Sequence, residues 1–395
     1  MNTIKQILAV SLLNLRNLPQ RLATSAVAVV GVGAVVLVFA AVLSMAAGLE
    51  KTMVAAGAND AVVITRSGAT SELNSGFSNE QVLIVANAPG VLKDGDAAVM
   101  SAELYVVTDV RKRSNNTDAN VPFRGVQAGA LDVRNGVEIV EGRLFEPGKN
   151  EIVVGRGALT EFVGLDVGET IRFGRTEWSI VGAFEAGGGV AESELWTDVR
   201  VLQSAYRRGN SFQSVRARLE GPGSIDVLRQ ALEDDPRIDA DVMSERDYYS
   251  SQSQGLVQFI KLIGYPLTVL MAIGAIFGAL NSMYSSVSVR GREIATLRAL
   301  GFGPAAVLVS TVVESVLLAA TGGVLGGLLA YVVFNGFQVS TLNGVSFSQV
   351  VFNFAVTPEL LIQGLKAALV IGVVGGLFPA VRAARLPVAQ ALREL

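Results

Sequence analysis

The chain contains long apolar segments that are separated by polar sequence. No charged residue occurs within 22–49 or within 262–289, and charged residues are sparse in 304–334 and 358–381. A helix needs about 20 apolar residues to cross the hydrocarbon core of a bilayer. The pattern therefore predicts four transmembrane helices, over 22–49, 257–289, 304–334 and 358–381.

The first residues follow a different pattern. Apolar residues at Ile4, Ile7, Leu8 and Leu12 recur close to helical spacing, with charged residues between them. Residues 1–21 are therefore expected to form an amphipathic helix on the cytoplasmic membrane face. The alternative is the charged start of a secretory signal, but the apolar segment that follows is longer than a cleaved signal needs.

Residues 50–256 form a long polar segment with the pattern of a folded domain. Residues 244–260 are expected to form a helical stalk that leads into the second span. Segment 81–86 fits a strand but also lies in a helical pattern over 78–88. Strand-like segments occur at 61–66, 103–110, 121–128, 151–155, 169–174, 177–185 and 212–220. The mixed order predicts an α+β domain, with a β-rich subdomain over 119–220 inside it.

Basic residues set the predicted topology. Arginines precede the first span, follow the second and follow the fourth, whereas 50–256 is rich in Asp and Glu. The positive-inside rule therefore places both termini in the cytoplasm and 50–256 outside. The fold class is a membrane α-helical protein with an extracytoplasmic α+β domain between the first and second spans. Residues 290–303 form a cytoplasmic connection, 335–357 a short periplasmic loop and 382–395 a cytoplasmic tail.

The chain has neither Cys nor His, which limits the chemistry available to it. Disulfides, Cys–His pairs, Ser–His–Asp triads and imidazole zinc sites are all excluded. No GxxxxGK[ST] sequence occurs, so the chain lacks a P-loop for ATP. Glu192 and Glu194 could be imagined as a catalytic pair, but their spacing does not distinguish them from solvated charges. No catalytic residue, metal site or bound cofactor is predicted.

Two charged side chains lie within predicted spans. Glu314 falls in the third span and Lys366 in the fourth. Because a charge in hydrocarbon is costly, Glu314 is expected to face protein or water, or to be protonated. The estimated depths of Glu314 and Lys366 in the membrane differ, which argues against an ion pair between them, and Lys366 can extend toward the interface.

Small residues recur in the spans at the spacing that lets membrane helices approach closely. These GxxxG pairs permit either packing within one chain or contact between two copies, and the sequence does not choose between them. The pairs are Gly274/Gly278, Gly322/Gly326, Gly323/Gly327 and Gly372/Gly376.

The stretch from Arg290 to Gly301 joins the second and third spans. It places apolar residues on one helical face and charged residues on much of the rest. Two interpretations fit this pattern equally well: an ordinary helix at the membrane interface, and a helix that docks on a cytoplasmic partner. The docking candidates are Arg290, Arg292, Glu293, Ile294, Leu297, Arg298, Leu300 and Gly301.

The same stretch carries a family resemblance. REIATLRALG, followed by a long helix with Glu314 and the Gly322-Gly323-Val-Leu-Gly326 run, resembles the FtsX-like permease domain. The C-terminal GLFPAVRAARLPVAQALREL is similar to the usual end of that domain. FRGVQAG, EGRLF, NEIVVGRGAL and IVGAFE, all between 123 and 185, resemble the MacB periplasmic core domain. The layout is similar to a stand-alone type VII ABC transporter permease of the DevC or LolC kind.

The resemblance implies a permease subunit that has no ATPase of its own. ATP and magnesium would be bound by a separate cytoplasmic ATPase, present in two copies. A second permease copy or a paralogue is implied too, and many members use a periplasmic adaptor and an outer-membrane duct. No nucleic-acid partner is implied.

The predicted function is therefore that of a non-catalytic inner-membrane subunit. It would couple ATP hydrolysis in its partner to motion of the periplasmic domain by mechanotransmission, for export or extraction of a drug, peptide, lipid or lipoprotein. The alternative is an ATP-regulated signalling or scaffold protein that controls an extracytoplasmic enzyme. An extracytoplasmic hydrolase is disfavoured by the absence of His and Cys.

Overall fold

The computed structural model describes residues 3–17, 22–55, 57–58, 60–134, 136–221 and 223–388. The predicted tail 382–395 and the predicted N-terminal helix 1–21 therefore lie partly outside the described residues. The chain divides into two compact units. The membrane unit comprises 1–47, 259–337 and 354–395, and the α+β domain comprises 48–258 and 338–353.

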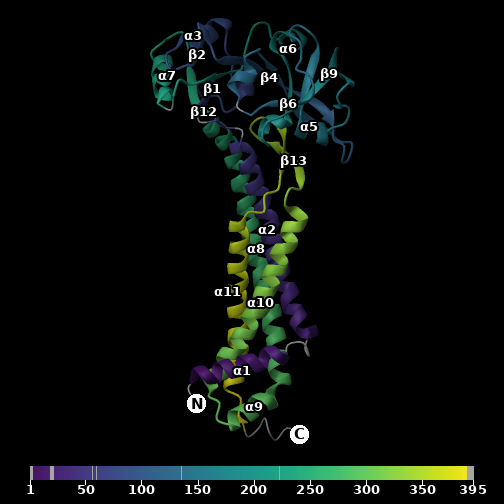
Figure 1. Cartoon of the computed structure of the whole chain (residues 1–395), viewed down its shortest axis with the longest axis vertical. Helices are drawn as coiled ribbons and strands as arrows, with labels where there is room; N and C mark the ends of the chain where they lie inside the picture. The colour runs from purple at the N-terminus through teal and green to yellow at the C-terminus, as the bar shows by residue number, and fades with distance from the viewer. Residues whose placement is uncertain are drawn as a thin grey trace. The chain divides into compact units, whose positions relative to one another are not determined.

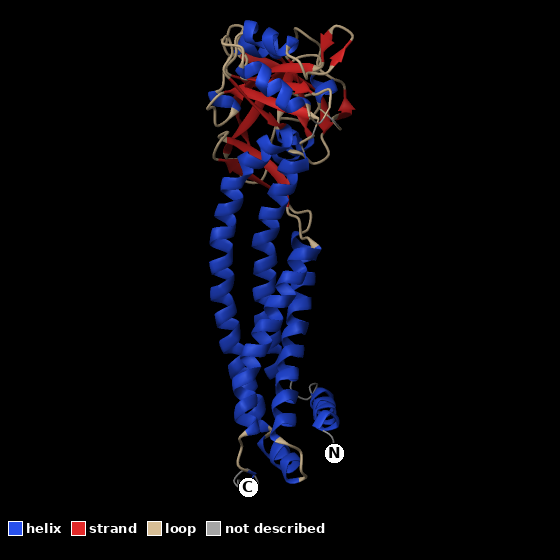
Figure 2. Ribbon diagram, turned by 90° about the vertical axis from the view of Figure 1, so that its left-hand side faces the viewer, coloured by secondary structure: helices blue, strands red, loops and turns tan. Residues whose placement is uncertain are grey.

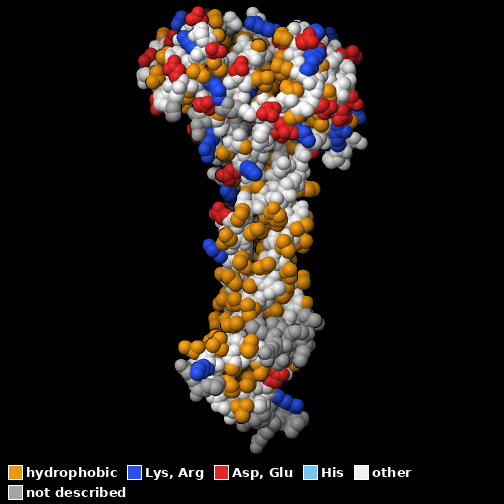
Figure 3. Space-filling view, in the orientation of Figure 1, with side chains coloured by type: hydrophobic (Ala, Val, Ile, Leu, Met, Phe, Trp, Pro, Cys, Tyr) orange, Lys and Arg blue, Asp and Glu red, His pale blue; other side chains and the backbone are white. Residues whose placement is uncertain are grey.

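Among the described residues, four helices are long and apolar enough to cross a membrane. They are α2 (Leu22–Ala55), α8 (Glu245–Val289), α10 (Pro304–Phe334) and α11 (Pro358–Ala384) (Figure 1). The prediction of four membrane helices with an α+β domain between the first two is confirmed. Helix α8 is continuous from Glu245, so the predicted stalk and the second span form one helix. Apolar side chains cover much of the membrane-unit surface, as Figure 3 shows.

Two shorter helices belong to the membrane unit. Helix α1 (Thr3–Asn17) exposes Ile4, Leu8 and Leu12, which lie on the stripe expected to face lipid. Helix α9 (Gly291–Ala299) lies between α8 and α10. Both helices contribute to the candidate site described below.

The α+β domain contains the strands drawn in red in Figure 2. Ten of them form one sheet with the order β12-β1-β11-β4-β5-β10-β7-β9-β6, in which β8 also pairs with β9. Neighbouring strands are antiparallel except for β5–β10 and β7–β9. The strands are β1 (Ala61–Arg66), β4 (Met100–Arg111), β5 (Asp118–Val126), β6 (Glu138–Gly142), β7 (Glu151–Gly155), β8 (Thr170–Phe173), β9 (Thr176–Glu185), β10 (Leu195–Asp198), β11 (Ser214–Arg218) and β12 (Ala240–Ser244).

Helices and short elements complete the domain. They are α3 (Asn79–Asn87), α4 (Ala130–Val133), α5 (Arg156–Glu161), α6 (Val199–Ala205), α7 (Ser224–Glu233), the 3-10 turns η2 (Glu72–Asn74) and η3 (Val190–Ser193), and the short strands β2 (Lys93–Asp94) and β3 (Ala97–Ala98). The main core surrounds Phe123, whose ring lies 5.0 Å from that of Trp178 in an edge-to-face arrangement. Strands β1 and β7 are buried along nearly their whole length, as expected where both sheet faces are covered.

The structure clarifies two features of the predicted domain, the conformation of segment 81–86 and the pairing of strand β11. Segment 81–86 lies in helix α3, because Ser78 and Gln81 form a reciprocal capping box that starts a helix there. Strand β11 lies within the predicted subdomain 119–220 but pairs with β1 and with the first part of β4. Strand pairing in this sheet therefore crosses the boundaries that the sequence suggested.

The segment 335–357 contains more than a loop. It forms an antiparallel hairpin of β13 (Gln338–Asn343) and β14 (Ser348–Asn353). The hairpin belongs to the α+β domain although it connects α10 to α11. Its contacts are considered under the further inference.

Candidate coupling site

Helix α9 is separated from its neighbours by two backbone breaks. Arg290 leaves the helical conformation between α8 and α9, with φ −93° and ψ 8°. Gly301 takes φ +92°, a left-handed conformation that glycine adopts without a steric penalty, and it ends α9. Pro304 then begins α10 at a first-turn position that suits proline. The sequence thus produces a short, separately oriented helix.

The inner face of α9 packs against the membrane unit. Ile294 is 5% exposed and lies in a cluster with Val287, Val307 and Ala383. These partners come from α8, α10 and α11. Because the inner face is buried against all three, α9 cannot shift as an independent element without disturbing this packing.

Arg290 is the polar centre of the site and is 5% exposed. Its guanidinium donates to the Glu314 carboxylate at 2.8 Å, to Glu293 at 3.3 Å and to the side-chain oxygen of Asn14. These contacts join α1, α9 and α10. A buried guanidinium matched by a buried carboxylate satisfies both charges, whereas removal of either partner would leave an uncompensated charge.

Three further hydrogen bonds lie at the C-terminal end of α9 and in the turn that follows it. Arg298 donates to the backbone oxygen of Leu386 at 2.7 Å, which holds the segment after α11. The Gln6 side chain accepts from the Gly303 backbone N–H at 3.1 Å and donates to the Gly301 carbonyl at 3.4 Å. Helix α1 therefore contacts the turn between α9 and α10, a role that its sequence did not indicate.

The structure separates the predicted docking residues into two sets. Arg290 and Ile294 are buried, and Leu297 and Arg298 are half-buried. The outward set is Arg292, Glu293, Leu300 and Gly301, with Leu300 73% exposed. A partner that docks on α9 would meet this outward set.

The two charged residues of the predicted spans lie in different environments. Glu314 is 5% exposed and pairs with Arg290, as described above. Lys366 is exposed on α11. The sequence left Glu314 facing protein or water, or protonated, and it did not identify Arg290 as a partner because the two residues are 24 positions apart.

The glycines of α10 contact α2 through two close approaches. A β-carbon added at Gly326 would lie 2.2 Å from the carbonyl oxygen of Gly33, and one at Gly322 would lie 2.5 Å from that of Val29. Both distances are far below van der Waals contact. Only glycine permits the two backbones to lie this close.

The other glycine pairs differ. Gly323 lies against Ala368 of α11, and Gly372 lies against Ala319 of α10. Gly327 and Gly376 face the same helix pair. A β-carbon at Gly274 or Gly278 of α8 would meet no atom within 4 Å. Within the described residues, the α10 and α11 glycines thus serve packing inside the chain, and the α8 pair has open space beside it.

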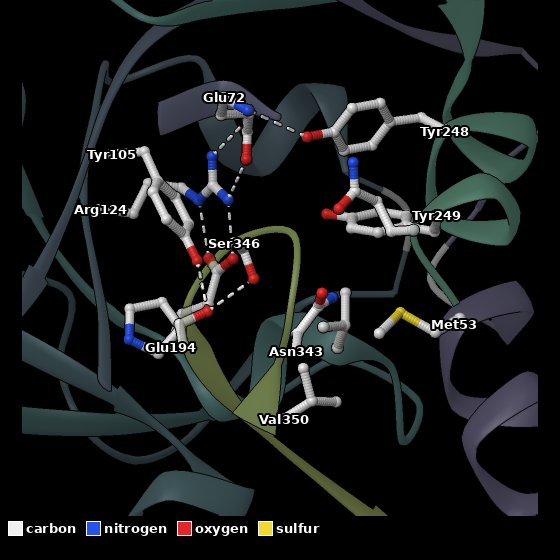
Figure 4. Close-up of a pocket in the computed structure, with 14 residues that line it drawn as sticks. Met53, Glu72, Tyr105, Arg124, Glu194, Tyr248, Tyr249, Asn343, Ser346 and Val350 are labelled. Carbon is white, nitrogen blue, oxygen red and sulfur yellow. Dashed lines mark hydrogen bonds and ion pairs between the residues drawn. The ribbon is translucent and has the colours of Figure 1, made fainter. Parts of the chain in front are cut away.

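A second polar site lies in the α+β domain and was not predicted. We call it the Arg124 cluster; it consists of Glu72, Glu103, Arg124, Arg134, Glu194, Arg216 and Glu245 (Figure 4 shows part of it). Arg124 is 1% exposed and contacts three carboxylates, with Glu72 at 2.8 Å, Glu103 at 2.9 Å and Glu194 at 2.7 Å. The members come from η2, β4, β5, β11, α8 and the segments after α4 and η3.

The Arg124 cluster fastens the start of α8 to the sheet. Arg216 of β11 pairs with Glu245, the first residue of α8, and donates to the Tyr249 hydroxyl at 2.9 Å. The Tyr248 hydroxyl accepts from the Glu72 backbone N–H at 3.3 Å. Displacement of the first turns of α8 must therefore move the cluster or break it.

Glu192 and Glu194 do not share a site. Glu194 is bound by Arg124 and by the indole N–H of Trp196, whereas Glu192 accepts from the backbone N–H groups of Ala186 and Gly188. Both carboxylates serve the structure of the domain. The sequence signal for the cluster was arginine inside apolar strands, as at Arg124 in VPFRGV.

The arginines lower the pKa of two carboxyls of the cluster, those of Glu103 and Glu72. Burial opposes ionisation of Glu103, but Arg134, Arg124 and Arg216 outweigh it and lower its pKa from 4.5 to about 2. For Glu72 burial likewise opposes ionisation, and Arg124 and Arg216 hold its pKa well below the usual value. The charged form of each carboxyl is thus the stable form in the folded domain.

These shifts predict acid sensitivity. Because the folded-state pKa values lie below those of the unfolded chain, their contribution is complete above about pH 4.5 and is lost as the pH falls toward 2. We expect the urea midpoint to be nearly constant between pH 7 and 5 and to fall steeply below pH 4.5. Tryptophan fluorescence would report this, because Trp196 contacts Glu194. A midpoint that is unchanged down to pH 2.5 would contradict the assignment.

The comparisons with known proteins agree with this architecture. The model of the MacB-like periplasmic core domain matches residues 22–235, and that of the FtsX-like permease C-terminal domain matches residues 267–388. The chain therefore belongs to the family of MacB-type ABC transporter permeases with an FtsX-like permease domain. With its four candidate membrane helices, it is a multi-pass protein of the inner membrane.

Two relatives illustrate the similarity. The macrolide export ATP-binding/permease protein MacB 1/2 of Paracoccus denitrificans is 25% identical over 337 residues, covering 79% of this chain and 47% of the relative. The uncharacterized ABC transporter permease YknZ of Bacillus subtilis is 25% identical over 304 residues, covering 72% of each chain. The chain thus spans about half the length of the MacB relatives.

Two solved structures also match the chain. The extracellular domain of the noncanonic ABC-type transporter YknZ from Gram-positive bacteria matches with a TM-score of 0.35 and 16% identity, over 47% of this chain and all of that one. The periplasmic region of MacB from Actinobacillus actinomycetemcomitans matches with a TM-score of 0.37 and 12% identity, over 51% of this chain and 95% of that one.

Proposed function

We propose that the chain is the permease subunit of an ATP-driven transporter that works by mechanotransmission. A separate cytoplasmic ATPase docks on the outward face of α9. The complete transporter contains two copies of this ATPase and a second permease subunit. The chain itself carries out no catalysis and binds no nucleotide. Both termini lie in the cytoplasm, and the α+β domain is periplasmic, following the positive-inside rule.

The observation that carries the proposal is the way α9 is held. Its inner face is packed against α8, α10 and α11, and Arg290 links it to α1 and α10. Its outer face presents Arg292 and Leu300. A push on that outer face would therefore be transmitted to α10 rather than absorbed by a loose loop.

The path continues outside the membrane through α8. That helix is continuous from Val289 to Glu245, where the Arg124 cluster binds it. A periplasmic adaptor and an outer-membrane duct are part of the proposal as further partners. The cargo would be a drug, peptide, lipid or lipoprotein that the α+β domain handles.

A docking test follows from the exposure of Leu300. Replacing Leu300 with aspartate should reduce co-purification of the ATPase more than tenfold, because it places a charge in an apolar contact. The matched control is Leu83→Asp on α3, where Leu83 is 56% exposed. The control should leave ATPase binding unchanged. Equal ATPase recovery with Leu300→Asp and with the parent chain would refute docking at this face.

A further inference from the structure

The β13–β14 hairpin forms a stiff connection between two membrane helices. Its ladder continues beyond the named strands, because Gly336 donates to the Phe354 carbonyl and Phe354 to the Phe337 carbonyl, each at 2.9 Å. Gly336 lies two residues after the end of α10, and Phe354 lies four residues before α11 begins. Little free chain therefore separates the hairpin from either helix.

The hairpin is bound to the α+β domain along β14. The Ser193 hydroxyl accepts from the Val351 backbone N–H at 2.9 Å, and the Asn120 side chain donates to the Phe347 carbonyl at 2.9 Å. Val351 is 6% exposed and forms part of the main core of the domain. Strand β14 is thus held by both apolar packing and polar contacts.

The other strand is bound as well. Lys112 donates to the Ser340 hydroxyl at 2.7 Å, and Ser340 donates to the Glu161 carboxylate at 2.5 Å. Gln338, the first residue of β13, donates to the Thr160 hydroxyl at 2.8 Å. Because both strands are attached, the hairpin is anchored at positions along its length rather than at its tip alone.

The hairpin and the Arg124 cluster line the same cavity. Its lining includes Asn343, Ser346 and Val350 of the hairpin together with Arg124 and Glu194 (Figure 4). Ser348 of the hairpin hydrogen-bonds the Tyr105 hydroxyl at 2.8 Å. The cavity measures about 30 Å³. That is room for one or two water-sized groups.

Docking of the hairpin has an energetic consequence. The charges of the Arg124 cluster are buried, so each depends on its partners remaining in place. Removal of the hairpin would expose the core around Val351 to water and would open the cavity beside Arg124. Undocking would therefore be costly, and the hairpin is expected to stay in place while the protein works.

We propose that the β13–β14 hairpin is a permanently docked strap that transmits displacement of α10 and α11 to the α+β domain. It acts in parallel with α8, whose first residue, Glu245, is bound by Arg216 of the Arg124 cluster. The proposal rests on the proposed function, because the displacement that it transmits comes from the ATPase docked on α9.

The first test removes the stiffness of the connection. Gly-Ser-Gly-Ser is inserted after Asn335 and after Ala355, which adds flexible chain on both sides of the hairpin. Spin labels at Val227→Cys on α7 and Val332→Cys on α10 report the distance between domain and helix, and the absence of native Cys keeps labelling specific. These label sites are 52% and 72% exposed.

In the complex with its ATPase, the parent chain should show a nucleotide-dependent change in this distance. The insertions should reduce that change by more than half. The same insertion at Gly174, in the open turn between β8 and β9, is the control and should have no effect. If the nucleotide-dependent change in distance were equal in the double-insertion variant and the parent, the strap proposal would be wrong and the proposed function would stand. A parent chain that binds the ATPase but shows no change would overturn the proposed function, and the strap with it.

The second test locks the hairpin in place. A β-carbon added at Gly157 would lie 3.3 Å from the Val351 β-carbon, slightly less than the roughly 3.5–4.5 Å found in disulfides, and 3.0 Å from the Glu192 carbonyl oxygen. In Gly157→Cys/Val351→Cys, oxidised before the spin labels are attached, the nucleotide-dependent change should be retained in full. Mass spectrometry verifies the bond. Loss of the change after oxidation would overturn permanent docking, because it would show that the hairpin must separate from α5.

Discussion

Replacing Arg124 with methionine is expected to destabilise the folded protein by about 3–5 kcal/mol or more, which is the cost of breaking a buried ion pair. The reason is that Glu72, Glu103 and Glu194 would each lose a charged partner while remaining buried. Net stabilities of single domains are about 5–15 kcal/mol, so a loss of this size could unfold the α+β domain. Urea unfolding of the full chain, followed by tryptophan fluorescence, measures the effect.

The chain offers a matched control for this experiment. Arg113 binds Asp166 with both contacts at 2.8 Å, but the two side chains are 40% and 51% exposed. Arg113→Met should cost less than about 1 kcal/mol, because water solvates the carboxylate that is left. Similar losses for Arg113→Met and Arg124→Met would contradict the view that burial makes the cluster important.

The Arg290–Glu314 pair gives the second large effect. Glu314→Leu should cost about 3–5 kcal/mol, because it leaves the Arg290 charge buried. It should also weaken ATPase binding, because Arg290 helps to hold α9 against α1 and α10. Thermal unfolding in detergent and co-purification of the ATPase measure the two consequences.

The double variant Arg290→Met/Glu314→Leu tests whether the loss of stability comes from the unpaired charge or from altered packing. It should recover most of the stability that the single change loses, since no unpaired charge remains. Lys366→Met is the control within a span and should have little effect, because Lys366 is exposed. A double variant as unstable as Glu314→Leu would show that the ion pair is not the source of the loss.

Much of the fold could be predicted from local pattern. The four apolar segments and the strand alternation of segments such as 61–66 and 177–185 correspond to α2, α8, α10, α11, β1 and β9. These elements follow from residues that are adjacent in sequence. Segment 81–86 was ambiguous because a short apolar run fits both the helical and the strand pattern of side chains. The capping box at Ser78 favours the helix.

The sites were less predictable, since they depend on contacts between distant residues. The α9 stretch was recognisable, but Arg290 and Glu314 are 24 residues apart and Arg290 and Asn14 are 276 apart. The Arg124 cluster gathers side chains from segments spread between 72 and 245. No spacing rule links such residues.

By itself the sequence determined the four long apolar segments, the absence of a P-loop motif and of Cys and His, and the position of the short connection between the second and third segments. These depend on composition and on short periodic patterns, which one stretch of chain displays alone. Only the tertiary structure decided which charges are partners, which glycines bring helices together, and that the segment after α10 is a hairpin bound to the α+β domain. Those outcomes depend on which parts of the chain, distant in sequence, bury their surfaces against one another when the helices and strands pack.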